Sequence, residues 1–276
     1  MRIAAAQIVT GEDPRANLRL IEEKTARAAE QGARVVVFPE AAQRAFGHSL
    51  TPIAEPVDGP WANGVREIAR QHQVVVVAGM FTPGVPSPEG RERVANTLIA
   101  VGPGDDHEVD VSYDKLHLYD AFGFQESKTV QPGAAPVTFT VWGLTFGLAT
   151  CYDLRFPELF TAYARHGTQA TLLPASWGAG PGKAEQWRLL ARARALDSTQ
   201  YLVACGQGLP SAAGREAVDG APTGVGHSAV IGPTGEVLAE AGEAPEMIIA
   251  ELDSERVAEA RTLLPVLANA REIPGR

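Results

Sequence analysis

Three segments of the sequence share one feature: a run of apolar or β-branched residues ends at, or passes through, an ionisable residue. VVVFPE leads to Glu40, SYDKLHLYD contains Lys115, and GLATCYDLRFPE contains Cys151. A carboxylate, an ammonium group and a thiol can together perform acyl transfer. The thiol needs a base to become a thiolate, and the oxyanion that it generates needs a donor. Strand ends are also where open α/β sheets bind their ligands.

Each of the three residues has a purely structural interpretation as well. Glu40 could cap a neighbouring helix, and Lys115 could be one end of a surface ion pair. Cys151 could be a small core residue, because free cysteine is among the most buried residue types. The choice between structure and chemistry depends on the elements that hold these residues.

Strand and helix patterns alternate along the chain. The first helix begins at Asp13 and Pro14, an N-cap followed by a first-turn proline, and Gly32 is placed to end it. Further helices are predicted over 61–73, 156–167, 183–200 and 253–264. Strands are predicted over 2–8, 33–40, 74–80, 96–102, 170–176, 201–206 and 247–252, with hairpins over 137–151 and 227–242. The patterns predict one α/β domain over residues 1–276, with a mixed sheet.

Composition excludes several classes of function. The 276 residues are 45% hydrophobic, which is ordinary for a globular domain, and no apolar stretch approaches the length of a membrane span. A formal net charge of -9 disfavours nucleic acid and anionic membrane surfaces as partners. Two cysteines cannot build a disulfide framework, and nothing resembles a signal peptide. We therefore expect a cytoplasmic protein.

Other catalytic motifs fail on inspection. The sequence has no G-x-S-x-G, and the S-x-x-K from Ser112 to Lys115 lacks its partner motifs and lies in an extended segment. GAGPGKAE follows a strand and opens a helix as a phosphate-binding loop would. However, Trp177 and Ala184 stand where that motif requires glycine and Ser or Thr. No H-E-x-x-H is present, so no metal site is expected.

The segments FPE, YDKLHLYD, GFQESKTVQPG and ATCYDLRFPEL resemble, in order and spacing, the signature segments of the carbon–nitrogen hydrolase (nitrilase) superfamily. The resemblance is nearest to the branch of omega-amidase and deaminated glutathione amidase. It implies a nitrilase-like α-β-β-α sandwich in a single domain, with its four layers forming once two copies pair, and usually a homodimer or a larger assembly. It implies no cofactor. Longer relatives continue beyond LLPVLANAREIPGR, so no C-terminal dimer arm is expected.

The resemblance also implies roles at matching positions. Cys151 would be the nucleophile, Glu40 the general base and acid, and Lys115 the oxyanion donor. Glu126 in FQES would orient this triad, and the backbone N–H of Tyr152 would be a second oxyanion donor.

Three further residues are expected to bind substrate. Ser176 and Trp177, in PASWG, match a pocket wall, although Trp177 could equally be core. Arg155 could hold a substrate carboxylate with its planar fork; alternatively, it could pair with Asp153 or Glu158.

These inferences predict an amidohydrolase that cleaves a small, linear, carboxylate-bearing amide through a Cys thioester and releases ammonia. An N-carbamoyl amino acid hydrolase or a nitrilase could use the same triad. A thiol redox or binding protein that retains the fold is the non-enzymatic alternative. Cys205, in YLVACG, is expected to be core. The loops 83–93 and 210–226 are expected to shape the pocket.

Overall fold

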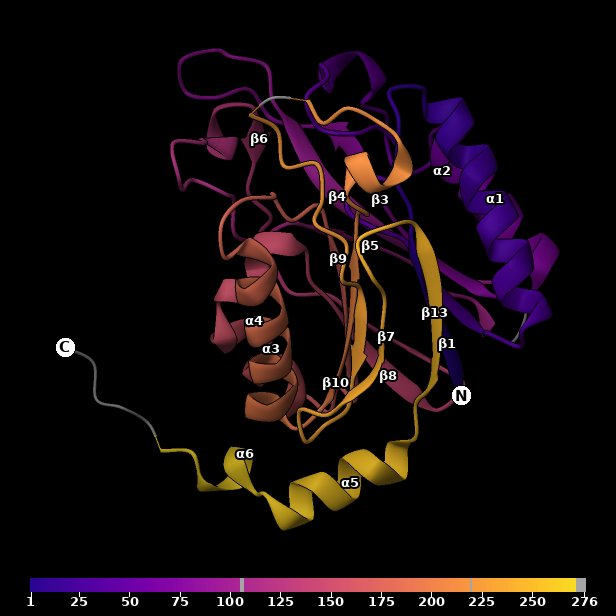
Figure 1. The fold of residues 1–276 in the computed structure, drawn as a ribbon, viewed down its shortest axis with the longest axis vertical. Helices are drawn as coiled ribbons and strands as arrows, with labels where there is room; N and C mark the ends of the chain where they lie inside the picture. The colour runs from indigo at the N-terminus through magenta and orange to yellow at the C-terminus, as the bar shows by residue number, and fades with distance from the viewer. Residues whose placement is uncertain (105–106, 219, 272–276) are drawn as a thin grey trace.

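A computed structural model describes residues 1–104, 107–218 and 220–271 of the protein. Two β-sheets lie face to face in the middle of the molecule, and a pair of helices covers the outer face of each (Figure 1). The chain is therefore layered as helix, sheet, sheet and helix.

The first sheet contains both the first and the last strand of the chain. Within the described residues its strands run in the order β13 (Glu246–Glu251), β1 (Arg2–Gln7), β2 (Val35–Val37), β3 (Val75–Pro83), β4 (Val94–Val101) and β5 (Asp110–Asp114), with β6 (Val130–Gln131) beside β4. Strands β1, β2 and β3 are parallel, and β4 is antiparallel to both β3 and β5. The carboxyl ends of β2 and β5 consequently lie at the same edge of this sheet.

The second sheet is built from the later part of the chain. Its described strands run in the order β12 (Val237–Glu240), β11 (Ala229–Ile231), β10 (Tyr201–Gly206), β9 (Ala170–Ala175), β8 (Leu144–Leu148) and β7 (Thr138–Val141). Strands β8, β9 and β10 are parallel, so their carboxyl ends share one edge. The predicted hairpins 137–151 and 227–242 are present as β7–β8 and β11–β12.

Helices seal the outer faces. Helices α1 (Pro14–Glu30) and α2 (Pro60–His72) pack on the first sheet, and α3 (Pro157–Arg165) and α4 (Lys183–Ser198) pack on the second. As predicted, the Asp13 side chain caps α1, accepting from the Arg15 N–H at 2.9 Å. After β13, α5 (Ser254–Leu263) and α6 (Val266–Asn269) run along the bottom of the view in Figure 1. No helix in the described ranges is both long and apolar enough to span a bilayer.

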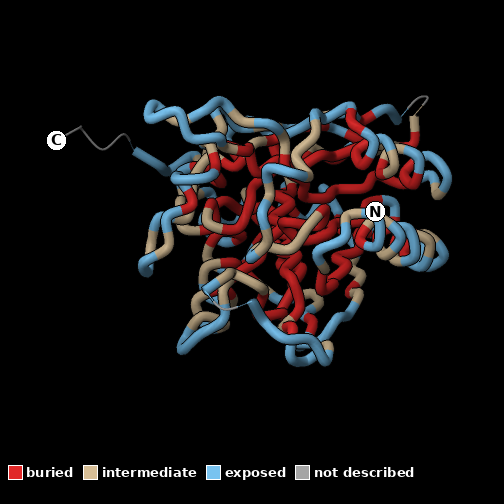
Figure 2. Tube along the Cα trace, turned by 90° about the horizontal axis from the view of Figure 1, so that it is seen from above, coloured by how far each residue is buried: buried red, intermediate tan, exposed pale blue. Residues whose placement is uncertain are grey.

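Strand alternation distributes apolar residues between two interfaces. In β1, Ile3 and Ala5 belong to the core between the sheets, whereas Ala4 and Ala6 belong to the core under α1 and α2. Because each sheet is covered on both faces, its central strands are mostly apolar, and buried chain fills the centre of the molecule (Figure 2).

The expectation of a single mixed sheet from the residue patterns is wrong, because the strands divide between two sheets. The α-β-β-α sandwich implied by the family resemblance is confirmed. Its four layers are complete within one chain, so the expectation that they form once two copies pair is corrected.

Candidate active site

The predicted site residues follow strands of both sheets. Glu40 comes after β2 and Lys115 directly after β5, whereas Cys151 comes after β8 and Ser176 directly after β9. All four line one pocket at the end of the sandwich. The complete lining is Glu40, Phe46, Lys115, Tyr119, Phe124, Glu126, Cys151, Tyr152, Arg155, Ser176, Trp177, Gly178, Lys183 and Pro222. The structure therefore brings together every site residue that the sequence predicted.

Cys151 lies at a sharp change of chain direction. It is the first residue of a 3-10 helix, η4 (Cys151–Arg155), and its φ of 47° is in the left-handed region that non-glycine residues rarely adopt. The turn is fixed by the Thr150 N–H, which donates to Asp153 Oδ2 at 2.8 Å. Such conformations persist where the surrounding structure over-determines them, and they concentrate at functional sites.

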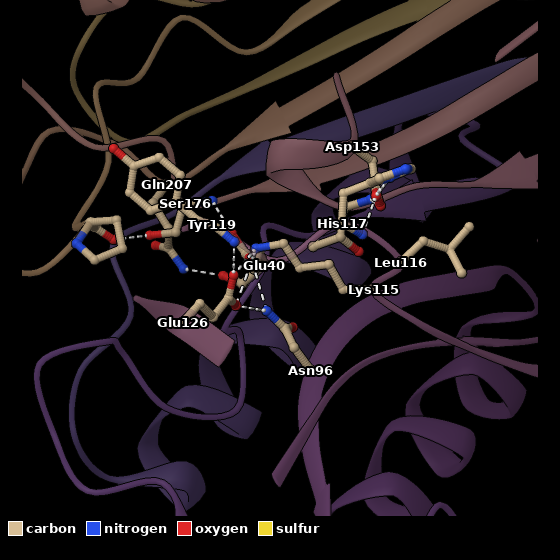
Figure 3. A network of polar contacts seen from close by, with 12 residues as sticks. Glu40, Asn96, Lys115, Leu116, His117, Tyr119, Glu126, Asp153, Ser176 and Gln207 are labelled. Carbon is tan, nitrogen blue, oxygen red and sulfur yellow. Dashed lines mark hydrogen bonds and ion pairs between the residues drawn. The ribbon is translucent and has the colours of Figure 1, made fainter. Parts of the chain in front are cut away.

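Lys115 joins two carboxylates in the floor of the pocket. Its Nζ lies 3.0 Å from Glu40 Oε1, and 2.9 and 3.2 Å from the two carboxylate oxygens of Glu126 (Figure 3). Lys115 and Glu40 are only 2% and 1% exposed. The surface ion pair considered for Lys115 is therefore wrong: this is a buried charged cluster, which needs further hydrogen bonds to be stable.

Those hydrogen bonds reach Glu40 from both sheets. The Ser176 N–H donates to Glu40 Oε2 at 2.8 Å, and Asn96 Nδ2 donates to Oε1 at 2.7 Å. Gln207 Nε2 donates to the backbone carbonyl of Glu40 at 3.0 Å. Gly79 of β3 lies against the backbone of Glu40 and Ala41. A Cβ at Gly79 would lie 2.8 Å from the Ala41 nitrogen, so only glycine allows β3 to approach this backbone so closely. Glu40 does not cap a helix; its carboxylate is held toward the pocket.

Glu126 is fixed from its own loop and from β4. It begins the short 3-10 helix η3 (Glu126–Lys128), and its Oε2 accepts from the Tyr119 N–H at 2.7 Å. Asn96 Nδ2 also reaches Glu126 Oε1 at 3.2 Å, so one amide group bridges the two glutamates. Sequence reasoning missed Asn96, because nothing in NTLIAVG distinguishes a bridging amide from an ordinary strand residue.

The cluster sets the protonation of its members. Burial alone would lower the pKa of Lys115, but Glu126 and Glu40 raise that pKa well above its ordinary value, so Lys115 is an ammonium group. Burial and the Glu40 charge raise the pKa of the Cys151 thiol well above normal, and Lys115 opposes this only in part. The resting site therefore contains a neutral thiol beside a carboxylate that can accept its proton.

The outer part of the pocket contains Arg155 and aromatic rings. The guanidinium carbon of Arg155 lies 4.9 Å from the centroid of Trp177 and 5.9 Å from that of Tyr152, and Nη2 donates to Gln186 Oε1 at 2.7 Å. The alternative pairing with Asp153 or Glu158 is not found among the described residues. Arg155 therefore lines the pocket without either of the carboxylate partners considered for it.

Trp177 has both of the roles considered for it. It lines the pocket, yet it is 5% exposed and packs on Trp187 in the core beneath α4, with ring centroids 5.4 Å apart. Cys205 lies in the core between the sheets, and burial raises the pKa of its thiol. Its structural interpretation is confirmed.

The loops contribute unequally. Pro222, from the 210–226 loop, lines the pocket, whereas none of residues 83–93 does. Tyr119, Phe124 and Lys183 also line it and were not singled out from the sequence. Lys183 is the lysine of the rejected phosphate-loop pattern GAGPGKAE. Among the described residues, no cluster of three or more His, Cys, Asp or Glu side chains could hold a metal ion.

Comparison with known proteins places this geometry in context. The family model for carbon-nitrogen hydrolases matches residues 2–262. A protein described as a hydrolase from Mycobacterium tuberculosis is 54% identical over 271 residues, which cover 98% of this chain and 95% of that one. The deaminated glutathione amidase of Escherichia coli is 36% identical, over 99% of this chain and 98% of the relative.

Solved structures agree with the sequence comparison. Saccharomyces cerevisiae Nit3, a nitrilase-superfamily member of branch 10, is 29% identical, with a TM-score of 0.79 over 96% of this chain and 94% of that one. A mutant of an amidase from Nesterenkonia sp. AN1, solved with the acetamide moiety of fluoroacetamide added covalently to its active-site cysteine, is 30% identical. Its TM-score is 0.79, over 98% of this chain and 94% of that one. This chain therefore belongs to the carbon–nitrogen hydrolase family.

Proposed function

We propose that this protein is an amidase that cleaves a small, linear, carboxylate-bearing amide through a thioester on Cys151. The observation that carries the proposal is the buried cluster in which Lys115 contacts Glu40 and Glu126 in the pocket that Cys151 lines. The amidases among the relatives and solved structures support the same chemistry.

In the first half-reaction, Glu40 takes the proton from the Cys151 thiol, and the sulfur attacks the amide carbonyl carbon. The oxyanion that forms accepts hydrogen bonds from Lys115 Nζ and from the backbone N–H of Tyr152. Glu40 then gives the proton to the departing nitrogen. The C–N bond breaks, ammonia leaves, and the acyl group stays on sulfur.

In the second half-reaction, Glu40 takes a proton from water, and the hydroxyl oxygen attacks the thioester carbonyl. The C–S bond breaks, the acid leaves, and Glu40 returns the proton to sulfur. Glu126 keeps Lys115 charged and in place through both steps, because it contacts the ammonium group at 2.9 Å without itself reacting.

Ser176 and Trp177 form walls of the substrate pocket, and Arg155 binds the substrate carboxylate. The guanidinium carbon of Arg155 lies over the rings of Trp177 and Tyr152, and one Nη group donates to Gln186, which leaves N–H donors of its fork for a carboxylate. Because Arg155 binds the substrate carboxylate, the enzyme favours amides of short acids that carry a carboxylate over larger or neutral amides.

The proposal is tested by an ammonia-release screen over amides of short mono- and dicarboxylic acids, 2-oxo acid amides and carbamoyl amino acids. Turnover of simple amides supports it. Carbon dioxide released together with ammonia would identify a carbamoyl hydrolase instead, and turnover of a nitrile to the acid would identify a nitrilase. A reactive Cys151 thiol without turnover anywhere in the panel would favour the thiol-protein alternative.

Two roles for Arg155, binding the substrate carboxylate or only supporting the turn, predict different effects on charged and neutral substrates. Arg155→Lys keeps the charge but removes the planar fork, so we expect KM to rise about tenfold for carboxylate-bearing amides and to change little for neutral amides. Equal losses of kcat/KM for both classes, together with a lower melting temperature, would show that Arg155 only supports the turn.

We also infer a homodimer in the cytoplasm. Three large apolar side chains are exposed on α4 and β12: Leu189 at 69%, Leu196 at 39% and Val237 at 43%. A second copy could cover them. Both cysteines are free, as a reducing compartment would keep them. Light scattering on the eluting protein tests the dimer, since Leu189→Glu should convert it to a monomer.

A further inference from the structure

We propose that Asn96 is a positioning residue that directs the proton of the Cys151 thiol to one oxygen of Glu40, Oε2, and keeps that carboxylate ionised. This inference rests on the proposed amidase function and deepens it, because it names the atom that acts as the base. Asn96 is not among the residues that line the pocket, so its side chain acts on the reaction through the two glutamates that do.

Backbone contacts on both sides hold Asn96 inside the first sheet. It lies in β4, is fully buried and pairs with Phe81 of β3. Its carbonyl oxygen accepts from the backbone N–H of Lys115 at 2.9 Å. The Asn96 amide is therefore fixed relative to Lys115 as well as to the glutamates, and Figure 3 shows it beside both carboxylates.

Glu126 has no acceptor position left open. An ionised carboxylate has about four such positions, two on each oxygen. On Glu126 Oε1 they are occupied by Asn96 Nδ2 and Lys115 Nζ, each at 3.2 Å. On Oε2 they are occupied by Lys115 Nζ at 2.9 Å and by the Tyr119 N–H at 2.7 Å. Glu126 is therefore saturated and cannot accept the thiol proton without losing a partner.

Glu40 keeps one position open. Asn96 Nδ2 at 2.7 Å and Lys115 Nζ at 3.0 Å occupy its Oε1. Among the described residues, its Oε2 accepts only from the Ser176 N–H, at 2.8 Å. The Glu40 charge is close enough to Cys151 to help raise the pKa of that thiol. The open position on Oε2 is therefore the one that can receive the thiol proton.

The orientation of the Asn96 amide supports this role. Its NH2 group supplies one N–H to each carboxylate, whereas its Oδ1 is buried without a hydrogen-bond partner among the described residues. The reverse orientation would turn Oδ1 toward two anionic oxygens, so the charges of the glutamates fix the amide as it stands. Buried acceptors are normally satisfied. The unsatisfied Oδ1 indicates that the fold keeps both donors on the glutamates even though the carbonyl group is left without one.

Loss of the Asn96 donors would change Glu40 in two ways. Its Oε1 would gain an open position, so the thiol proton would no longer be directed to Oε2. A buried carboxylate with fewer donors also favours its protonated form, which cannot serve as a base. The ionisable groups that act on one another in this cluster are Glu40, Lys115, Glu126 and Cys151. Lys115 is the one cation among them, and it would have to keep both glutamates ionised alone.

The first test compares two replacements of Asn96. Asn96→Val fills the space with apolar atoms, whereas Asn96→Ala leaves room for a water molecule that can donate to both glutamates. We expect Asn96→Val to lower kcat about 100-fold and to change KM less than about twofold, with the larger loss on the acid side of the pH profile. Asn96→Ala should retain more activity than Asn96→Val. A residue that only fills space would give the opposite order, and that order would overturn the proposal.

Asn17 provides a matched control. It is also buried, and its Nδ2 also donates to two acceptors, but both are backbone carbonyls, those of Gly11 and Gln43, each at 2.9 Å. Asn17→Val removes the same pair of donors without touching a carboxylate. We expect it to leave kcat and the shape of the pH profile unchanged. A fall in kcat equal to that of Asn96→Val would contradict a specific role for Asn96.

The second test does not depend on turnover. Infrared difference spectra recorded against pH would follow the C=O band of protonated carboxyl groups. We expect Asn96→Val to show such a band at a pH at which the wild type shows none, and the addition of Glu40→Gln to remove it. Identical spectra for the wild type and Asn96→Val, or a band that persists after Glu40→Gln, would overturn the proposal. If the wild-type enzyme hydrolyses no amide at all, the proposed function fails, while the infrared result still decides whether Asn96 keeps Glu40 ionised.

Discussion

The carboxylate of Asp153, in the turn that carries Cys151, accepts a hydrogen bond from the backbone N–H of His117 at 3.0 Å and contacts the ring Nδ1 of His117 at 2.7 Å. His117 comes two residues after Lys115 and stacks on Phe156, with ring centroids 3.7 Å apart. Asp153 therefore ties the end of a strand in one sheet to the nucleophile turn of the other (Figure 3).

We expect Asp153→Asn to impair both stability and catalysis. Asp153 is fully buried, and it also accepts from the Tyr113 hydroxyl at 2.6 Å. The side-chain amide of asparagine would place its N–H groups against the N–H and O–H groups that now donate to Asp153, so donor would face donor. The free energy of unfolding should fall by about 3 kcal/mol, and kcat by about 10- to 100-fold as the lysine and the thiol move apart.

Urea unfolding and steady-state kinetics measure the two effects of Asp153→Asn. Asp58→Asn is the control, because Asp58 is exposed and remote from the pocket. Wild-type kcat in Asp153→Asn would show that the link is not needed to position Lys115 and Cys151.

The two cysteines should behave oppositely when replaced. Cys151→Ala is expected to lower turnover more than about 10³-fold while the protein still folds, because the thioester cannot form. Cys205→Ala should stay active and lose about 1 kcal/mol of stability, since it removes a small core side chain. Ammonia release and thermal melts check both variants. Substantial activity in Cys151→Ala would refute its assignment as nucleophile.

Glu40→Gln should make the thiol more acidic and the enzyme inactive. The Glu40 charge helps to raise the pKa of Cys151, so its removal lowers that pKa, although burial still keeps it above normal. More thiolate is then present at any given pH, yet no base remains to serve water and the leaving group. Ultraviolet absorbance of the thiolate, measured against pH, gives the thiol pKa, and an ammonia-release assay gives the activity. A thiol pKa that stays the same or rises would contradict this account.

Lys115→Arg should be nearly inactive. The Lys115 ammonium group is 2% exposed and fills the space between Glu40 and Glu126, where a planar guanidinium cannot keep the same contacts. Because one oxyanion donor is misplaced, kcat should fall about 10²–10³-fold. Circular dichroism would verify folding. Lys24→Arg serves as the control, because Lys24 lies on α1, pairs with Glu23 and does not line the pocket. A near-normal rate would mean that Lys115 only balances charge.

Much of the site was predictable because strand ends are visible in sequence. VVVFPE and GLATCYDLRFPE each show a buried run breaking into polar residues, and parallel strands bring such breaks to one edge. The division into two sheets was not predictable from those runs, since a strand covered on both faces has the same composition in either sheet. The two-sheet sandwich was expected only from the family resemblance, and not from the residue patterns.

The supporting residues were not predictable for a different reason. Asn96 and Asp153 act through hydrogen bonds to partners 56 and 36 residues away, and local patterns carry no record of such pairings. Lys183 was considered only within a phosphate-loop motif that failed. Its position against Phe122 depends on how the segment before α4 crosses the pocket.

The division of the site between the sheets has a consequence for folding. Ser176 holds Glu40 across 136 residues of chain, and Gln207 holds it across 167, so the catalytic centre consists of contacts that are distant in sequence. Closing such long loops is slow, because their entropy is lost before the contacts form. We therefore expect regained activity during refolding to lag behind the recovery of secondary structure, and to report the moment when the two sheets dock.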